Sequence, residues 1–157
     1  MWIKIDGEYK YIRDDEFATQ VLGGEEISNI LVSPGEGNLC IQTKSRLNVT
    51  FVAEGEGCSE TWFAELIGVT NVLGHICLGI TDVKTDNRFP NPEDGNTRQD
   101  SDLVYGFNII TENGDCLVVF RNSSIGYYYG EYSVLTDIVP SNDWVNVKDD
   151  WCAYGNG

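Results

Sequence analysis

The sequence predicts an α+β fold that consists mainly of antiparallel sheet, with one or two short helices packed on one face. Three observations lead to this prediction. Two segments have the pattern of β-hairpins, and two others have helical spacing of their apolar residues. In addition, the two halves of the chain repeat a similar order of elements, as a pseudo-symmetric sheet would require.

The two hairpins give the strand prediction most of its support. The first joins Leu39–Thr43 to Leu47–Val52, whose side chains alternate between two faces. The second joins Gly106–Thr111 to Cys116–Phe120 through a turn that contains Asn113-Gly114, a pair that readily adopts left-handed backbone. A further strand is predicted over Ile27–Val32, and a small hairpin is predicted to close at residues 5–8.

Two short helices are predicted from capping and spacing. In Asp14–Leu22 an aspartate caps the helix, Phe17, Val21 and Leu22 share a face, and Gly23-Gly24 ends it. The second helix begins at Ser59 as its cap, with Glu60 at its positive end. Its apolar stripe would be Phe63, Leu66 and Ile67, and Gly68 would end it.

The halves also suggest an internal duplication. Leu22-Gly23 leads into Ile27–Ile30 and the first hairpin, and Leu73-Gly74 leads into Ile76–Ile80 and the second. This order predicts two pseudo-repeated three-stranded units. The alternative is chance, because two matched hairpins also arise in any all-antiparallel chain.

Length and composition predict one domain over residues 1–157, with a core at 22–135, an N-terminal extension at 1–21 and a C-terminal tail at 136–157. Hydrophobic residues make up 41% of the chain and aromatic residues 11%, which favours a folded protein over a disordered one. Apolar runs are too short for a membrane span, and the N-terminus lacks the pattern of a signal peptide. We therefore expect a cytoplasmic protein.

Net charge constrains the choice of partner most strongly. Twenty-five acidic residues against ten basic ones give a formal charge of −15 and a pI near 4.1. Phosphate backbones and anionic membranes repel such a chain, whereas basic proteins attract it. We therefore expect no direct contact with nucleic acid or membrane.

Catalytic and metal-binding motifs are absent from the sequence. With five scattered cysteines and a single histidine, His75, no zinc spacing can be built, and no cofactor is expected. Cys58 is the best candidate for a nucleophile, because a thiol at the start of the predicted second helix would have a lowered pKa. Its only candidate base is His75, and a buried or inert free thiol is the alternative interpretation.

The candidate binding residues are a few arginines, several aromatic residues and one asparagine in an otherwise acidic sequence. Arg98 and Arg121, together with Arg88 and Trp62, are the best set for holding an anion. A run of polar and aromatic residues after the second hairpin adds further candidates, since tyrosine and arginine are common at recognition sites. The full predicted binding set is Trp62, Arg98, Arg121, Asn122, Tyr127 and Tyr129. The alternative for the run is an amphipathic edge strand, with Arg121 paired to a carboxylate.

Three motifs resemble a family of small bacteriophage and bacterial proteins whose function is not established. They are Cys58-Ser59-Glu60-Thr61-Trp62-Phe63, Asp94-Gly95-Asn96-Thr97-Arg98-Gln99 with Val104-Tyr105-Gly106-Phe107, and Arg121-Asn122-Ser123-Ser124-Ile125-Gly126-Tyr127-Tyr128. The resemblance covers about 110 residues, from Leu22 to Tyr132. It implies an accessory protein of a mobile element, in the cytoplasm of the host cell if a phage encodes it, and it implies no reaction.

Three functions follow as hypotheses. The first is a non-enzymatic acidic protein that inhibits a basic host protein, such as a defence nuclease, by presenting a surface that mimics nucleic acid. The second is a module that binds or sequesters a nucleotide signal, with the long segment 84–101 as a lid. The third is a thiol enzyme that uses Cys58.

Overall fold

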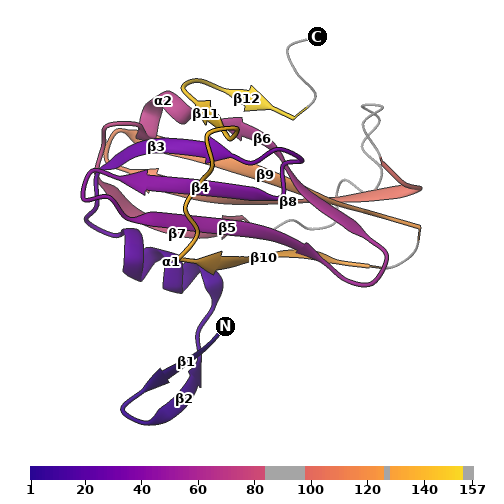
Figure 1. The fold of residues 1–157 in the computed structure, drawn as a ribbon, viewed down its shortest axis with the longest axis horizontal. Helices are drawn as coiled ribbons and strands as arrows, with labels where there is room; N and C mark the ends of the chain where they lie inside the picture. The colour runs from indigo at the N-terminus through magenta and orange to yellow at the C-terminus, as the bar shows by residue number, and fades with distance from the viewer. Residues whose placement is uncertain (84–97, 126–127, 154–157) are drawn as a thin grey trace.

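The structure is a computed structural model that describes residues 1–83, 98–125 and 128–153. Two five-stranded antiparallel sheets lie one behind the other in Figure 1, so the predicted predominance of antiparallel sheet is confirmed. The first sheet has the order β10-β5-β4-β3-β11, and the second has the order β12-β6-β9-β8-β7. The strands of the first sheet are β3 (Ile27–Val32), β4 (Asn38–Thr43), β5 (Asn48–Gly55), β10 (Gly130–Leu135) and β11 (Val145–Val147). Those of the second are β6 (Glu60–Ile67), β7 (Cys77–Val83), β8 (Ser101–Thr111), β9 (Gly114–Ser124) and β12 (Trp151–Cys152).

The core lies between the two sheets. Alternation along each strand turns one set of apolar side chains inward, and the inward sets of both sheets form one continuous buried cluster. Aromatic rings dominate its centre: Phe51 of the first sheet stacks on Phe107 of the second, with ring centroids 4.8 Å apart. Tyr132 lies 4.9 Å from Phe107 and 5.7 Å from Phe120, so these rings join the sheets.

Most predicted elements are confirmed. Ile27–Val32 is β3, the two predicted hairpins are β4–β5 and β8–β9, and the small N-terminal hairpin consists of β1 (Trp2–Ile5) and β2 (Glu8–Tyr11). The first helix, α1, spans Asp14–Leu22 as predicted. Its cap differs from the prediction, because Arg13 occupies the N-cap position without a side-chain hydrogen bond and Asp14 lies inside the first turn.

The predicted second helix is wrong, because residues 60–67 form strand β6. A β-bulge explains the misleading pattern. Phe63 pairs with Phe120, but the next pair is Glu65 with Val119, so one extra residue resets the alternation. Phe63 and Leu66 therefore both reach the core at a spacing of three residues, which imitates a helical stripe. Ile67, the third member of the predicted stripe, is exposed.

The second helix of the structure, α2 (Val69–Val72), follows Gly68 rather than preceding it. The chain segments after α1 and after α2 bind each other reciprocally. The Gly24 N–H donates to the Cys77 carbonyl and the Gly74 N–H donates to the Ile27 carbonyl, at 2.8 and 2.7 Å. β3 and β7 also each carry a bulge just after their first residue, between Ile27 and Asn29 and between Cys77 and Gly79.

Helix α1 covers the gap between two sheet edges, those of β7 and β10. The Ile80 N–H of β7 donates to Thr19 Oγ1 at 2.9 Å, which satisfies a backbone donor at the edge. At the other side, the Asp14 carboxylate accepts a hydrogen bond from the Val134 N–H of β10. The helix therefore holds the two sheets together along this side.

The β1–β2 hairpin and the strands after β10 lie at the periphery of the two paired sheets. In Figure 1 the β1–β2 hairpin projects away from both sheets, and the segment after β10 crosses the first sheet to reach β11. That segment then adds β11 to the edge of the first sheet and β12 to the edge of the second. No helix in the described ranges has the length and apolar character needed to cross a membrane.

Candidate functional site

Three of the predicted binding residues meet on the outer face of the second sheet. Trp62 of β6 and Arg121 of β9 are direct cross-strand partners. The guanidinium carbon of Arg98 lies 4.0 Å from the centroid of a Trp62 ring, which is a cation–π contact. Trp62 and Arg121 are buried although their neighbours Phe63 and Phe120 face the core, so the outer face is covered at this point.

Carboxylates already hold both arginines. Arg98 lies 3.7 Å from Glu36 and 3.7 Å from Glu60, through different guanidinium nitrogens. The Arg121 Nε lies 3.2 Å from an Asp102 carboxylate oxygen, and the side chains of this pair are 4% and 0% exposed. A buried pair of this kind is held by geometry and is costly to break. A phosphate would have to displace carboxylates to reach either arginine, which weakens the expectation of an anion site.

Asn122 lies on the opposite face of the same strand. Its side-chain amide donates to Thr61 Oγ1 at 2.9 Å, between the sheets. Glycine is required at Gly55 here, because a Cβ would lie 2.5 Å from Thr61 Oγ1 and 2.8 Å from Asn122 Nδ2. Tyr129 precedes β10 and is exposed. The predicted set therefore divides between two faces, while Tyr127 and Arg88 lie outside the described residues.

The environment predicted for Cys58 is absent. Cys58 is exposed in the turn before β6, and no helix begins there. Glu60 pairs with Ser123 near the end of β9, whereas His75 precedes the Cys77–Thr111 pair at the opposite end of the β8–β9 hairpin. Eleven paired residues at about 3.3 Å each separate those ends by roughly 30 Å. His75 therefore cannot act as a base for Cys58.

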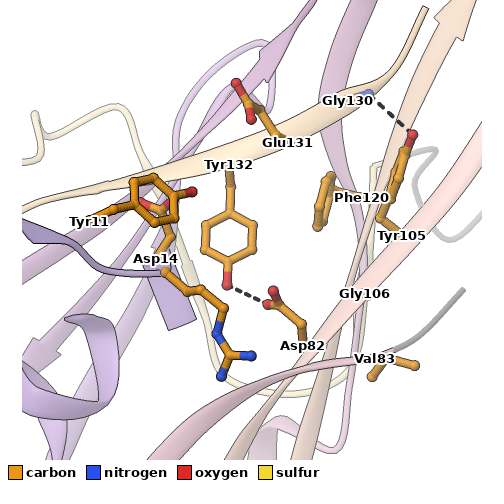
Figure 2. Close-up of a pocket in the computed structure, with 11 residues that line it drawn as sticks. Tyr11, Asp14, Asp82, Val83, Tyr105, Gly106, Phe120, Gly130, Glu131 and Tyr132 are labelled. Atoms are coloured by element: carbon orange, nitrogen blue, oxygen red, sulfur yellow. Dashed lines mark hydrogen bonds between the residues drawn. The ribbon is translucent and has the colours of Figure 1, made fainter. Parts of the chain in front are cut away.

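A cavity that sequence reasoning missed lies between the edges of β7 and β10. Its volume is about 260 Å³, and Figure 2 shows its lining. Carboxylates and aromatic rings dominate the walls. The side chains that define its chemistry are Tyr11, Arg13, Asp14, Asp82, Tyr105, Phe120 and Tyr132, whereas the Glu131 carboxylate points away from Tyr132 on the other side of β10 (Figure 2). Five separate segments of the chain supply them, so no local motif could have revealed the cavity.

Two tyrosines give the cavity fixed walls. The Tyr132 hydroxyl donates to Asp82 Oδ1 and thereby connects β10 to β7 (Figure 2). The Tyr105 hydroxyl accepts from the Gly130 N–H at 3.2 Å, also between the two sheets. The Tyr105 ring stacks on Phe120 with centroids 5.1 Å apart. Hydrogen bonds and stacking therefore fix the orientation of these rings.

Two carboxyl groups of the cavity, those of Asp14 and Asp82, have raised pKa values. Burial raises the pKa of Asp82, and the nearby charges of Asp15 and Asp14 raise it further, against the lowering effects of the Tyr132 hydrogen bond and of Arg13. Burial also raises the pKa of Asp14. The pKa of Tyr132 is raised, first by burial and then by its bond to Asp82, so its hydroxyl stays protonated and acts as a donor.

The arrangement suits recognition of a positive group rather than of an anion. Aromatic faces and carboxylates are the two kinds of surface that bind organic cations. Within the described residues, no group of three or more His, Cys, Asp or Glu side chains is arranged to hold a metal ion.

Comparison with known proteins adds no relative to this description. No protein-family model, no curated protein sequence and no solved structure matches the chain.

Proposed function

We propose that this chain is a non-enzymatic acidic interaction protein that binds a basic nucleic-acid-binding protein, such as a nuclease, and occupies its groove with carboxylates in place of phosphates. The resemblance to phage and bacterial accessory proteins makes the expected partner a host defence protein. Its place of action would then be the cytoplasm of the host cell.

The observation that carries the proposal is a pair of glutamates set against each other. Glu54 of β5 and Glu131 of β10 are direct cross-strand partners on the outer face of the first sheet, and both are exposed. Like charges at directly opposed positions destabilise a sheet. Glu56 follows at the end of β5 and is also exposed. A basic partner would remove this repulsion on binding.

Three of the arginines form ion pairs with carboxylates of the same chain. Arg13 pairs with Asp15 and Glu16, Arg98 with Glu36 and Glu60, and Arg121 with Asp102. These arginines are directed at the protein's own carboxylates. The exposed glutamates of β5 and β10 therefore face the solvent without an arginine counter-charge from these three residues.

The test is retention of a partner at two salt concentrations. The tagged chain is incubated with lysate of its natural host at low and high salt, and retained proteins are identified and assayed for nucleic-acid binding. We expect a basic nucleic-acid-binding protein to be retained at low salt and released at high salt. Its binding to nucleic acid should fall when the chain is added.

Charge variants locate the surface. The triple variant Glu54→Gln, Glu56→Gln and Glu131→Gln should lose retention. A matched variant that neutralises three exposed acids elsewhere, Glu112→Gln, Asp115→Asn and Asp143→Asn, should keep most of it. Retention that is independent of salt, or equal loss in both variants, would contradict the proposal.

Nucleotide sequestration is the remaining alternative, and it requires the carboxylate partners of Arg98 and Arg121 to move away. A thermal-shift panel of nucleotides distinguishes the two functions. Stabilisation by a nucleotide that disappears in Arg98→Gln would favour the alternative over the acidic interaction protein.

We also propose that the chain arose from a duplicated unit, one copy comprising α1 to β6 and the other α2 to β10. Support comes from the strand orders: β10-β5-β4-β3 and β6-β9-β8-β7 correspond if each copy gives its last strand to the other's sheet. The reciprocal bonds of Gly24 and Gly74 correspond at an offset of 50 residues, as do the two bulges. Failure of the two copies to superpose would contradict this proposal.

A further inference from the structure

We infer that the cavity between the edges of β7 and β10 binds a guanidinium or alkylammonium group. The natural ligand would be a basic side chain of the partner protein, and this part of the inference rests on the proposed function. The same chemistry belongs to free amines of small molecules, and the experiment below separates these two sources.

The first argument is charge. Asp14 and Asp82 line the cavity, and among its described lining residues Arg13 is the only one with a positive side chain. The Arg13 Nε lies 3.3 Å from Asp15 and 3.0 Å from Glu16, so this arginine is tied to the first turn of α1. The charges acting on Asp14 include the amino terminus, which lowers its pKa, and Glu54 and Asp15, which raise it. The anions therefore outnumber the cations around the cavity.

The second argument is the aromatic wall. The ring of Tyr132 stands beside the Asp82 carboxylate, and the stacked rings of Tyr105 and Phe120 line the same cavity (Figure 2). A cation placed against an aromatic face and bonded to a carboxylate gains both a cation–π and a charge-assisted contact. Because Tyr132 already uses one oxygen of Asp82, the carboxylate is held in a fixed orientation for a ligand.

The third argument is size. A volume of about 260 Å³ is below the roughly 300–1,000 Å³ that holds a drug-sized ligand. The cavity therefore suits the head of one side chain better than a whole nucleotide. Tyr132 of its wall follows Glu131 in β10, so a basic partner that covers Glu54 and Glu131 would lie near the cavity.

The experiment is a titration of the ¹⁵N-labelled full-length chain followed by NMR. The probes are argininamide, the neutral isostere citrullinamide, the small diamine putrescine and a short arginine-rich peptide. We expect argininamide to shift the backbone amides of Asp82, Gly106 and Tyr132, and citrullinamide to leave them unchanged. Bound argininamide should also lower the pKa of the Asp82 carboxyl, a readout that a nonspecific surface contact would not give.

Two variants of equal charge provide the control. Asp82→Asn keeps an acceptor for the Tyr132 hydroxyl but removes the negative charge, and should weaken argininamide binding by at least about tenfold. Asp143→Asn removes an exposed charge before β11, at the opposite edge of the first sheet, and should leave binding nearly unchanged. Tighter binding of the peptide than of putrescine would assign a protein side chain as the natural ligand, and the reverse would assign a free amine.

Several outcomes would overturn the inference. Equal binding of argininamide and citrullinamide would show that charge is not recognised, and equal effects of the two variants would place the binding elsewhere. Binding that appears only in Arg13→Gln would mean that Arg13 itself fills the cavity. If a basic protein is retained in a salt-sensitive way but Asp82→Asn has no effect on argininamide or protein, the proposed function stands and this site falls. If argininamide binds but no basic protein is retained, this site stands and the proposed function falls.

Discussion

At some positions of this fold, the residue type is restricted by the close approach of neighbouring backbone as much as by side-chain chemistry. Gly68 joins β6 to α2 with φ at +93°, a region that side chains rarely adopt. A Cβ there would also collide with the Asp115 carbonyl oxygen of β9, a backbone atom that cannot move aside. Gly74 has a similar φ of +80° but has open space around the position of a Cβ. Substitutions at the two glycines can therefore be compared to distinguish the cost of backbone strain from the cost of steric overlap.

We predict that Gly68→Ala destabilises the protein by roughly 3 kcal/mol or more, whereas Gly74→Ala costs about 1–2 kcal/mol. The difference reflects the overlap with Asp115, since the backbone strain is common to both. Urea unfolding followed by circular dichroism measures both values. Equal losses in the two variants would show that β9 relaxes around the new methyl group.

Residue types also predicted that some of the candidate residues would lie close together. Arginines and a tryptophan in an acidic chain indicated a cluster, and Trp62, Arg98 and Arg121 do lie together. What the residue types did not indicate was their ion pairing, because Glu36, Glu60 and Asp102 approach them from distant parts of the chain. A pairing of this kind depends on sheet register rather than on sequence spacing.

At the scale of elements, the edges of the sheets explain the position of α1. An edge strand presents unpaired backbone groups and is a template for aggregation unless something covers it. Thr19 of α1 accepts the Ile80 N–H of β7 and donates to the Asp15 carbonyl within its own helix at 2.8 Å. One hydroxyl therefore joins the helix to the second sheet.

We predict that Thr19→Val lowers stability by about 1–3 kcal/mol, because the Ile80 N–H loses its partner while side-chain volume is conserved. Thr136→Val, at an exposed position after β10, serves as the control and should change stability by less than about 0.5 kcal/mol. Thermal unfolding of both variants checks the expectation. Increased self-association of Thr19→Val at high protein concentration would further support the edge-covering role, and an unchanged stability would argue against it.

Element types were predictable where local patterns agree with tertiary structure and failed where a bulge intervened. The hairpins β4–β5 and β8–β9 follow from alternation and turn residues, and α1 follows from its glycine end. β6 was mistaken for a helix because its bulge gives Phe63 and Leu66 the spacing of a helical face. Only pairing with β9 distinguishes the two, since Phe63 and Leu66 would be buried in either structure.

At the scale of the whole molecule, the charge of −15 acts on stability as well as on partners. Mutual repulsion among acids opposes folding, and burial strengthens this effect at the cavity. The folded state raises the pKa of both Asp14 and Asp82 above the ordinary value of 3.8. It therefore retains protons on these groups to a higher pH than the unfolded chain does.

We predict that stability falls as pH rises from 3.8 through the folded-state pKa values of Asp14 and Asp82, because only the folded state resists their ionisation there. The urea midpoint should be higher near pH 3.8 than near about pH 7.5 at low salt, and the difference should shrink at roughly 0.5 M salt. Asp82→Asn should reduce the pH dependence relative to Asp143→Asn. A midpoint that rises with pH over this range would contradict the assignment.

The sequence by itself determined the class of this protein: an acidic chain of mostly antiparallel sheet, with hairpins and one helix that local patterns specify, and with a surface charge that favours basic partners. The tertiary structure alone decided how the chain uses those parts. It decided which carboxylates pair with the arginines and which strand completes each sheet. It also formed the cavity of carboxylates and rings beside Tyr132. All three depend on residues far apart in the chain. Long-range strand pairing brings them together, and its register is not written in any short stretch of residues.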